Sequence, residues 1–180
     1  MPFMDAYMPE CALSSDAERK LVATITDLLL EHEGVDPSNE KARHLAWVFV
    51  HRPVVYVAGA PPRSPRYLFI CQAPEGQYDD ARGTAMTTGI TQAVAEAEDG
   101  AWPHPEHRVG IFALEIPDGT WGGAGRLIRL PDIYELVWPP RPGMEGEPRE
   151  TAEQVLAARR RGEAEQTLRA AGERAAVRGA

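Results

Sequence analysis

The sequence lacks several features that would assign a function class at once. Its apolar runs fall far short of the roughly 18 residues that a membrane span needs, and no basic and apolar leader opens the chain. Two cysteines occur among 180 residues, Cys11 and Cys71, and their spacing matches neither a zinc nor a redox motif. These absences predict a cytoplasmic protein that binds no membrane and no metal.

A basic surface is also missing. The formal net charge of the chain is -8. Residues 138–180 hold eight Arg and seven Glu, which leaves 11 basic and 20 acidic residues in 1–137. The acidic character of residues 1–137 argues against general nucleic-acid binding, because phosphate backbones are bound by clustered Lys and Arg. An anionic small-molecule substrate would therefore need arginines placed locally.

What the sequence does contain is an unusual start. Pro2 opens an apolar stretch over residues 2–8 that is typical of a β-strand, at the strand position where the missing N–H of proline costs nothing. If Met1 is removed, the Pro2 nitrogen becomes a secondary amine. An α-amine has a pKa of about 7.7–8.0, and burial would lower that pKa. Pro2 is therefore a candidate base or nucleophile near neutral pH, unless it merely begins an edge strand.

The rest of the chain repeats one pattern. Helical spacing of apolar residues predicts a first helix over about 15–33, which begins with a capping box at Ser15–Glu18 and ends at Gly34. A strand follows at 47–50, and the order then recurs as a strand at 67–71, a helix at about 79–98 and a strand from 110. At an offset of 65 residues, Pro9, Glu10, Ile25, Thr26, Glu31 and Glu33 meet Pro74, Glu75, Ile90, Thr91, Glu96 and Glu98.

This repeat predicts an α/β fold built from two tandem β-α-β units, residues 2–59 and 66–125. Right-handed crossovers place both helices on one face of a four-stranded sheet. The other face must be buried elsewhere, which indicates an oligomer. We expect a single domain over 1–137, followed by a tail at 138–180.

Two segments outside the repeat carry weaker signals. Residues 117–125 are rich in glycine, but they lack the Lys-Ser/Thr of a phosphate-binding P-loop and predict a hairpin that carries Trp121. The Pro-rich run from Trp138 to Gly143 cannot continue a sheet. Residues 149–177 favour a helix by composition but show no sustained apolar stripe, so they predict a solvated helix or a disordered tail.

Together these features resemble the tautomerase superfamily, in particular its fused, cis-3-chloroacrylic acid dehalogenase-like branch. The resemblance covers about residues 2–137. It depends on Pro2, on Ile25-Thr26-Asp27, on Val57-Ala58-Gly59 and on the order of Glu115-Ile116-Pro117 before Gly125-Arg126. It implies a symmetric homotrimer, with Pro2 at the floor of a pocket and with no metal or organic cofactor.

The resemblance does not extend to the dehalogenase's other active-site residues. Where that family has a histidine, two arginines, a tyrosine and a water-activating glutamate, this chain has Leu29, Pro74, Gln77, Phe112 and a position at or near Gly123. Without the glutamate and the arginine clamp, dehalogenation is not expected. Candidate substitutes for substrate binding are Arg63, Arg66, Tyr56, Trp121 and Arg126. Each of these arginines could equally be a solvated surface residue.

Two functions remain open from the sequence. In the first, Pro2 acts as general base or acid on a small carbonyl compound or unsaturated acid. This function requires removal of Met1, which a small second residue permits. In the second, the chain is a catalytically degenerate trimeric scaffold or ligand-binding protein of the same fold. Nucleic-acid binding through the tail is poorly supported, because the tail is nearly neutral.

Overall fold

The computed structural model describes residues 2–138 and 146–178, with side chains up to residue 169. Met1 and the Pro-rich stretch 139–143 lie outside the described residues. The chain forms two compact units, Met1–Ile116 and Pro117–Ala180. A domain boundary after residue 137 stays a prediction.

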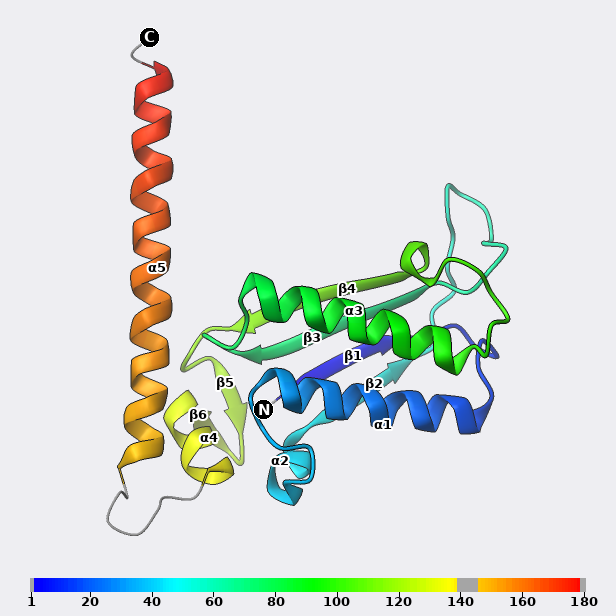
Figure 1. The fold of residues 1–180 in the computed structure, drawn as a ribbon, viewed down its shortest axis with the longest axis horizontal. Coiled ribbons are helices and arrows are strands. Elements are labelled where there is room, and N and C mark those ends of the chain that lie inside the picture. The colour runs from blue at the N-terminus through cyan, green and yellow to red at the C-terminus, as the bar shows by residue number, and fades with distance from the viewer. Residues whose placement is uncertain (1, 139–145, 179–180) are drawn as a thin grey trace. The chain divides into compact units, whose positions relative to one another are not determined.

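The first unit is built on one four-stranded mixed sheet (Figure 1). Its strands are β1 (Phe3–Tyr7), β2 (Trp47–His51), β3 (Tyr67–Pro74) and β4 (Val109–Ile116), in the order β2-β1-β3-β4. The outer pairs β1/β2 and β3/β4 are parallel, whereas β1 and β3 are antiparallel. This arrangement is the predicted pair of β-α-β units, related by the antiparallel junction in the middle of the sheet.

Helices α1 (Ser15–His32) and α3 (Asp80–Ala97) lie side by side across one face of the sheet (Figure 1). The first and last residues of both helices agree with the predicted ranges to within one residue. The α1 cap is Ser14 rather than the predicted Ser15, since the Ser14 side chain accepts from Ala17 N–H at 3.2 Å. The two helices approach closely at Gly89, where a Cβ would lie 3.2 Å from a Leu28 methyl.

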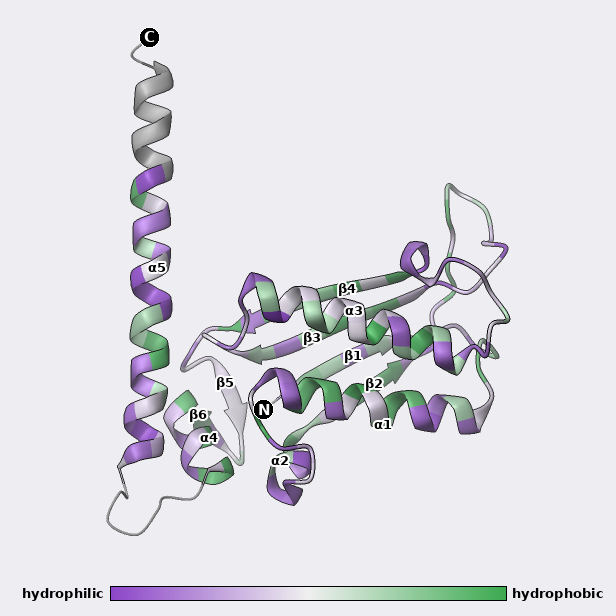
Figure 2. Cartoon of the chain, in the orientation of Figure 1, coloured by the Kyte–Doolittle hydropathy of each residue, from purple (hydrophilic) through white to green (hydrophobic). Residues whose placement is uncertain are grey.

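The core of this unit fills the space between the helices and the sheet. Alternate residues of β1 and β3 point into it, so Met4, Ala6, Phe69 and Cys71 are at most 1% exposed. The helices contribute their apolar stripes, which end with Leu29 and Leu30 on α1 and with Val94 on α3. Figure 2 shows both helices as bands of hydrophobic and hydrophilic residues, as expected of helices with one buried side.

The opposite face of the sheet keeps large apolar side chains exposed. Trp47 and Phe49 of β2 are 55% and 47% exposed, and Phe112 and Leu114 of β4 are 55% and 47% exposed. Phe3 stacks on Trp47 with ring centroids 5.3 Å apart. Polar contacts interrupt this face only where Asp5 accepts from Gln72 at 3.0 Å and lies 2.7 Å from His51, among the described residues.

Two connections depart from the sequence expectations. A short helix, α2 (Glu40–Leu45), precedes β2, and it was not predicted because only Ala42 in it is buried. The connection after β2 also contains an isolated bridge between Val57 and Ala60, whose two intervening residues have positive φ angles. That conformation is typical of a tight hairpin turn.

The second unit contains the predicted glycine hairpin and the tail. Strands β5 (Trp121–Gly123) and β6 (Arg126–Ile128) pair in antiparallel fashion, followed by helix α4 (Leu130–Val137). The tail forms helix α5 (Glu147–Arg178), which agrees with the helical alternative. Its Ala152 and Leu156 are buried in a small core with Leu130.

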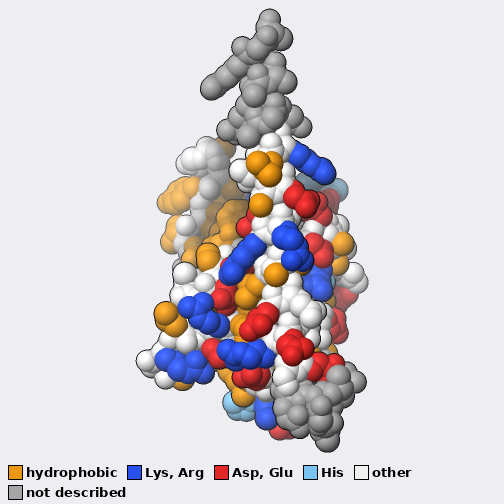
Figure 3. All heavy atoms as spheres, turned by 90° about the vertical axis from the view of Figure 1, so that its left-hand side faces the viewer, with side chains coloured by type: hydrophobic (Ala, Val, Ile, Leu, Met, Phe, Trp, Pro, Cys, Tyr) orange, Lys and Arg blue, Asp and Glu red, His pale blue; other side chains and the backbone are white. Residues whose placement is uncertain are grey.

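Beyond that small core, α5 is polar. Figure 2 shows mainly hydrophilic residues along it, and Figure 3 shows its Arg and Glu side chains interleaved. One such pair joins Arg159 to Glu163 at 3.2 Å. None of the described helices, α5 included, combines the length and apolar character that crossing a bilayer would require.

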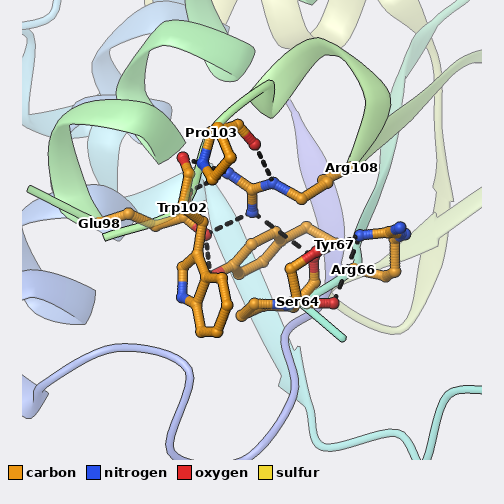
Figure 4. A network of polar contacts seen from close by, with 8 residues as sticks. Ser64, Arg66, Tyr67, Glu98, Trp102, Pro103 and Arg108 are labelled. Atoms are coloured by element: carbon orange, nitrogen blue, oxygen red, sulfur yellow. Dashed lines mark hydrogen bonds and ion pairs between the residues drawn. The ribbon is translucent and has the colours of Figure 1, made fainter. Parts of the chain in front are cut away.

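A buried ion pair closes the end of the second β-α-β unit (Figure 4). Glu98 forms the C-cap of α3, and its carboxylate accepts two hydrogen bonds from Arg108 at 2.5 and 2.6 Å. The Tyr67 hydroxyl adds a third at 3.0 Å. The remaining Arg108 donors reach backbone carbonyls, including those of Pro103 and Trp102. Glu98 and Arg108 are 6% and 4% exposed, so the pair is compensated entirely within the protein.

Replacing Arg108 with leucine should therefore destabilise the first unit strongly. The substitution leaves the Glu98 carboxylate buried without its counter-charge, a change that costs about 3–5 kcal/mol in comparable sites. The measurement is urea unfolding followed by circular dichroism. Arg19→Leu is the matched control, because the Arg19–Asp16 pair is exposed and should contribute less than about 1 kcal/mol. Equal losses in the two variants would contradict the role assigned to the buried pair.

Candidate active site

Pro2 lies where the sheet meets the end of the first helix. Its carbonyl oxygen accepts from Trp47 N–H at 3.2 Å, which fixes the residue just ahead of β1. Its side chain is less than 2% exposed. Because side chains alternate along a strand, Pro2 shares the helix-covered face with Met4 and Ala6. The predicted burial of Pro2 is therefore present in the structure.

The end of α1 places a carboxylate in the same region. Glu33 is the C-cap of this helix, and Gly34 follows it with φ +74°. Gly34 N–H bonds to the Glu31 carbonyl and Val35 N–H to the Leu30 carbonyl, both at 2.9 Å. These two bonds form a Schellman motif, which fixes the direction in which the chain leaves the helix. The Glu33 side chain is consequently held inside the protein, at 7% exposed.

The surroundings of Glu33 set its protonation. Burial raises the pKa of the Glu33 carboxyl, and the chain's N-terminal amine lowers this pKa by a smaller amount through charge and hydrogen bonding.

The turn after β3 brings Tyr78 near Glu33. Residues 74–78 leave the strand in a turn that the Glu115 carboxylate holds, accepting from Gly76 N–H at 3.1 Å and from Tyr78 N–H at 2.8 Å. Burial raises the pKa of the Tyr78 hydroxyl, and the charges of Cys71, Glu33 and Glu115 raise it further. Tyr78 is therefore a neutral phenol near the Glu33 carboxyl, able to donate or accept a hydrogen bond.

Cys71 is not a nucleophile. It is 0% exposed in the core of β3, and burial raises the pKa of its thiol to about 12. A reactive cysteine needs a stabilised thiolate and access to solvent or substrate, and Cys71 has neither.

Three of the predicted substrate-binding residues lie at the other end of the sheet from Pro2. Phe3 pairs with Gln72 and Tyr7 with Leu68, so the start of β3 lies beyond the end of β1. Four residue steps along a strand correspond to about 13 Å. Arg66 precedes β3 and donates to the Ser64 hydroxyl at 2.8 Å. Arg63 and Tyr56 lie in the same connection, and Tyr56 is 64% exposed.

Trp121 and Arg126, the other two predicted residues, belong to the β5–β6 hairpin of the second unit. Trp121 is 6% exposed. Arg126 is exposed and forms an ion pair with Asp132 at 3.1 Å. Both residues of the hairpin turn, Ala124 and Gly125, have positive φ angles, as a two-residue turn between paired Gly123 and Arg126 requires.

The positions at which the dehalogenase has its other functional residues carry no comparable chemistry here. Leu29 is 1% exposed and belongs to the core, and Pro74 ends β3. Gln77 is 4% exposed in the turn that Glu115 holds. Phe112 is on the exposed face of the sheet, and Gly123 ends β5. The sequence-based expectation that dehalogenation chemistry is lost agrees with these placements.

Two other features lie away from Pro2. An open groove of about 510 Å³ separates the first turns of α1 from the end of α3, lined by residues such as Lys20 and Glu96, at the opposite end of α1 from Glu33. His104, Glu106 and His107 have their ligand atoms within 4.8 Å of one another, but all three are exposed. In this cluster His104 Nδ1 lies 3.0 Å from Glu106 Oε1.

Comparison with known proteins supports the architecture rather than any one activity. No protein-family model matches the chain, and no curated protein matches its sequence. Solved structures do match. Pt0534 inactivated by 2-oxo-3-pentynoate is 19% identical, with a TM-score of 0.56, over 69% of this chain and 94% of Pt0534.

Two further structures extend the comparison. N1, a member of the cis-3-chloroacrylic acid dehalogenase family, is 17% identical with a TM-score of 0.56, over 85% of this chain and 97% of N1. The asymmetric trimer of wild-type R7 fused 4-OT is 16% identical with a TM-score of 0.55, over 69% of this chain and 94% of that protein. This chain has the tautomerase fold. The resemblance drawn from Pro2 and the repeated units is thereby confirmed at the level of the fold, with a dehalogenase-branch member among the neighbours.

Glu33 was missed as a candidate from the sequence. A glutamate at the end of a helix ordinarily lies in solvent, so its type and position gave no reason to expect burial. One signal was present, since Glu33 and Glu98 coincide in the 65-residue repeat. Two buried carboxylates at equivalent C-caps are the structural meaning of that coincidence.

Proposed function

We propose that this protein is a tautomerase-type enzyme that needs no metal or organic cofactor. Its catalytic group is the secondary amine of Pro2, exposed by removal of Met1, and its substrate is a small carbonyl compound or an unsaturated acid. The observation that carries this proposal is the burial of Pro2 just ahead of β1, on the face of the sheet that the helices cover. An amine shielded there exchanges protons with a bound substrate rather than with bulk water.

The reaction that suits this site is the interconversion of an enol and its ketone. The Pro2 nitrogen takes a proton from the carbon next to a carbonyl, and the ammonium returns a proton to the other end of the enol. No bond other than those to hydrogen is made or broken, so the step needs no further reagent. The lack of the family's arginines at Pro74 and Gln77 favours a substrate with less negative charge than a dicarboxylate.

A homotrimer is the second part of the proposal. The helix-free face of the sheet carries the exposed side chains of Trp47, Phe49, Phe112 and Leu114. Apolar patches of this kind mark interfaces, and the fused 4-OT neighbours are trimers. Because Arg63, Arg66 and Tyr56 lie far along the sheet from Pro2 of the same chain, they reach a substrate only at the Pro2 of a neighbouring subunit. Trp121 and Arg126 stay candidates for the same pocket.

The second candidate function is a non-catalytic trimer that binds a ligand or partner. The observation that favours it is the replacement of the dehalogenase's charged groups by Leu29 in the core and Pro74 at the end of β3. We place either function in the cytoplasm, supported by two free cysteines, one of them exposed.

Pro2→Ala should separate these two functions. The substitution keeps the fold but replaces the secondary amine, and positioned acid–base groups contribute about 10²–10⁴ in rate. We expect turnover of an enol of a 2-oxo acid to fall by about 100-fold or more, with KM changed much less. The measurement is the rate of ketonisation across a panel of such enols and of unsaturated acids. Absence of turnover by the wild-type protein on the whole panel, or equal rates in both proteins, would favour the scaffold.

Phe112→Asp should dissociate the trimer. A carboxylate on the exposed apolar face would be buried without a partner in the assembly, which opposes association strongly. Multi-angle light scattering should give about three times the 19.8 kDa chain mass for the wild type and a smaller mass for the variant. Leu168→Asp is the control, because Leu168 is 73% exposed on α5 and should leave the mass unchanged. A monomeric wild type would overturn the trimer.

A further inference from the structure

The connection between α3 and β4 gathers three side chains that bind metals well. His104 caps a single 3₁₀ turn, η1 (Pro105–His107), which contains Glu106 and His107. One nitrogen of each imidazole and one carboxylate oxygen lie within 4.8 Å of one another, the single group of this kind in the described part of the chain. The expectation that the chain binds no metal was drawn from its two cysteines, and this group contains neither of them.

The spacing of the ligand atoms suits a small divalent ion. Glu106 Oε1 lies 3.0 Å from His104 Nδ1 and 3.8 Å from His107 Nε2. In a tetrahedral zinc site with bonds of about 2.0–2.1 Å, neighbouring ligand atoms are about 3.3 Å apart. The two observed distances lie on either side of that value. Small rotations of the side chains therefore bring all three ligand atoms onto one ion.

The backbone that carries these ligands is anchored by the buried ion pair. Arg108 follows the turn directly, and its guanidinium donates to the carbonyls of Pro103 at 3.0 Å and Trp102 at 3.2 Å (Figure 4). Within the turn, His107 N–H donates to the His104 carbonyl at 3.1 Å. The ligands thus project from a segment fixed on both sides, so that binding an ion orders mainly their side chains.

The backbone of His104 is strained in a way that brings the two imidazoles together. Its φ and ψ angles are 56° and 60°, in the left-handed region that residues with a side chain rarely adopt. The following Pro105 favours an extended conformation in the residue before it, which opposes this geometry further. With His104 in this conformation, its ring stacks on that of His107 with centroids 5.9 Å apart. Strain of this kind is concentrated at binding sites.

We propose that His104, Glu106 and His107 bind a divalent transition-metal ion, with Zn²⁺ as the expected occupant. Imidazole ligands select such ions, whereas Mg²⁺ and Ca²⁺ are bound by oxygen ligands. The three side chains are 72%, 55% and 76% exposed, which leaves room for water to complete the coordination. An open site with three protein ligands binds its ion reversibly, and we expect a Kd in the micromolar range.

This site is separate from the proposed catalytic centre. The turn leads into β4, whose first residue, Val109, pairs with Tyr67. Phe3 pairs with Gln72, further along β3, so Pro2 lies about 16 Å away along the sheet. A bound ion therefore plays no part in proton transfer at Pro2 of the same chain. It joins the two ends of the turn and stabilises the fold, because it binds the folded chain.

The test is isothermal titration calorimetry with ZnCl₂ on the full-length protein, purified without a histidine tag and stripped with a chelator. We expect one ion per chain for the wild type and no binding of MgCl₂. Loss of an outer-shell partner weakens metal binding by about 10–100-fold, so loss of a ligand in His107→Ala or Glu106→Gln should cost at least about tenfold. The control is His44→Ala, which removes an exposed histidine of α2 and should leave the affinity unchanged.

NMR of the imidazole nitrogens locates the ion. Zn²⁺ should shift the resonances of His104 and His107 and leave those of His44 and His51 in place. At about 100 times the Kd, Zn²⁺ should also raise the midpoint of thermal unfolding by a few degrees in the wild type but not in His107→Ala.

Three results would overturn the site. They are the absence of binding by the wild type, equal affinity in the wild type and His107→Ala, and loss of affinity in His44→Ala. All three ligands are exposed, so their variants should keep the circular dichroism of the wild type. Should His107→Ala not fold, Glu106→Gln decides in the same way. Turnover by Pro2 that stops when zinc is removed would contradict the separation of the two sites.

Discussion

The fold of the first unit, residues 1–116, depends on how it accommodates two buried glutamates, Glu33 and Glu98, one in each β-α-β unit. Each β-α-β unit ends its helix with a glutamate that points into the protein rather than into solvent. A buried charge without a partner costs several kcal/mol, so a buried acid is either paired with a cation or kept neutral. Beside Glu98, the second β-α-β unit has Arg108, held by the carbonyls of the loop before β4. In the first β-α-β unit Leu45 and Ala46 precede β2 where Arg108 precedes β4, and burial raises the pKa of the Glu33 carboxyl, which favours its neutral form.

The proposed function uses this difference between otherwise similar halves, because it places the chemistry at the Pro2 end and leaves the Glu98–Arg108 end to stabilise the fold. The Glu98–Arg108 pair uses its donors and acceptors within the protein, leaving none for a ligand. In the proposed function, the amine at Pro2 gains and loses a proton, whereas a guanidinium cannot do so near neutral pH. The duplicated units thus keep a buried glutamate at the same helix end, and the second pairs its glutamate with Arg108.

Much of the fold could be predicted from the sequence, because it follows from periodic patterns. Helices α1 and α3 carry long apolar stripes, and the repeat fixed their order relative to the strands. Helices with few buried residues were harder to predict. Helix α2, which buries only Ala42, was missed, and α5, which buries a few residues near its start, was predicted only as one of two alternatives. At the site, Pro2 was identifiable from its place in the chain. The burial of Glu33 was not, because it depends on the Schellman turn at Gly34 and on which face of the sheet lies below.

The account depends most directly on whether the mature chain begins at Pro2. Intact-mass spectrometry with N-terminal sequencing of the protein, purified without an N-terminal tag, measures this. A mass short by one methionine, with proline read first, is the predicted result, because only then is the Pro2 nitrogen a titratable amine. A full-length mass would contradict the central claim, since the Pro2 nitrogen would be an amide without basicity. The fold would then be that of a tautomerase without its catalytic group.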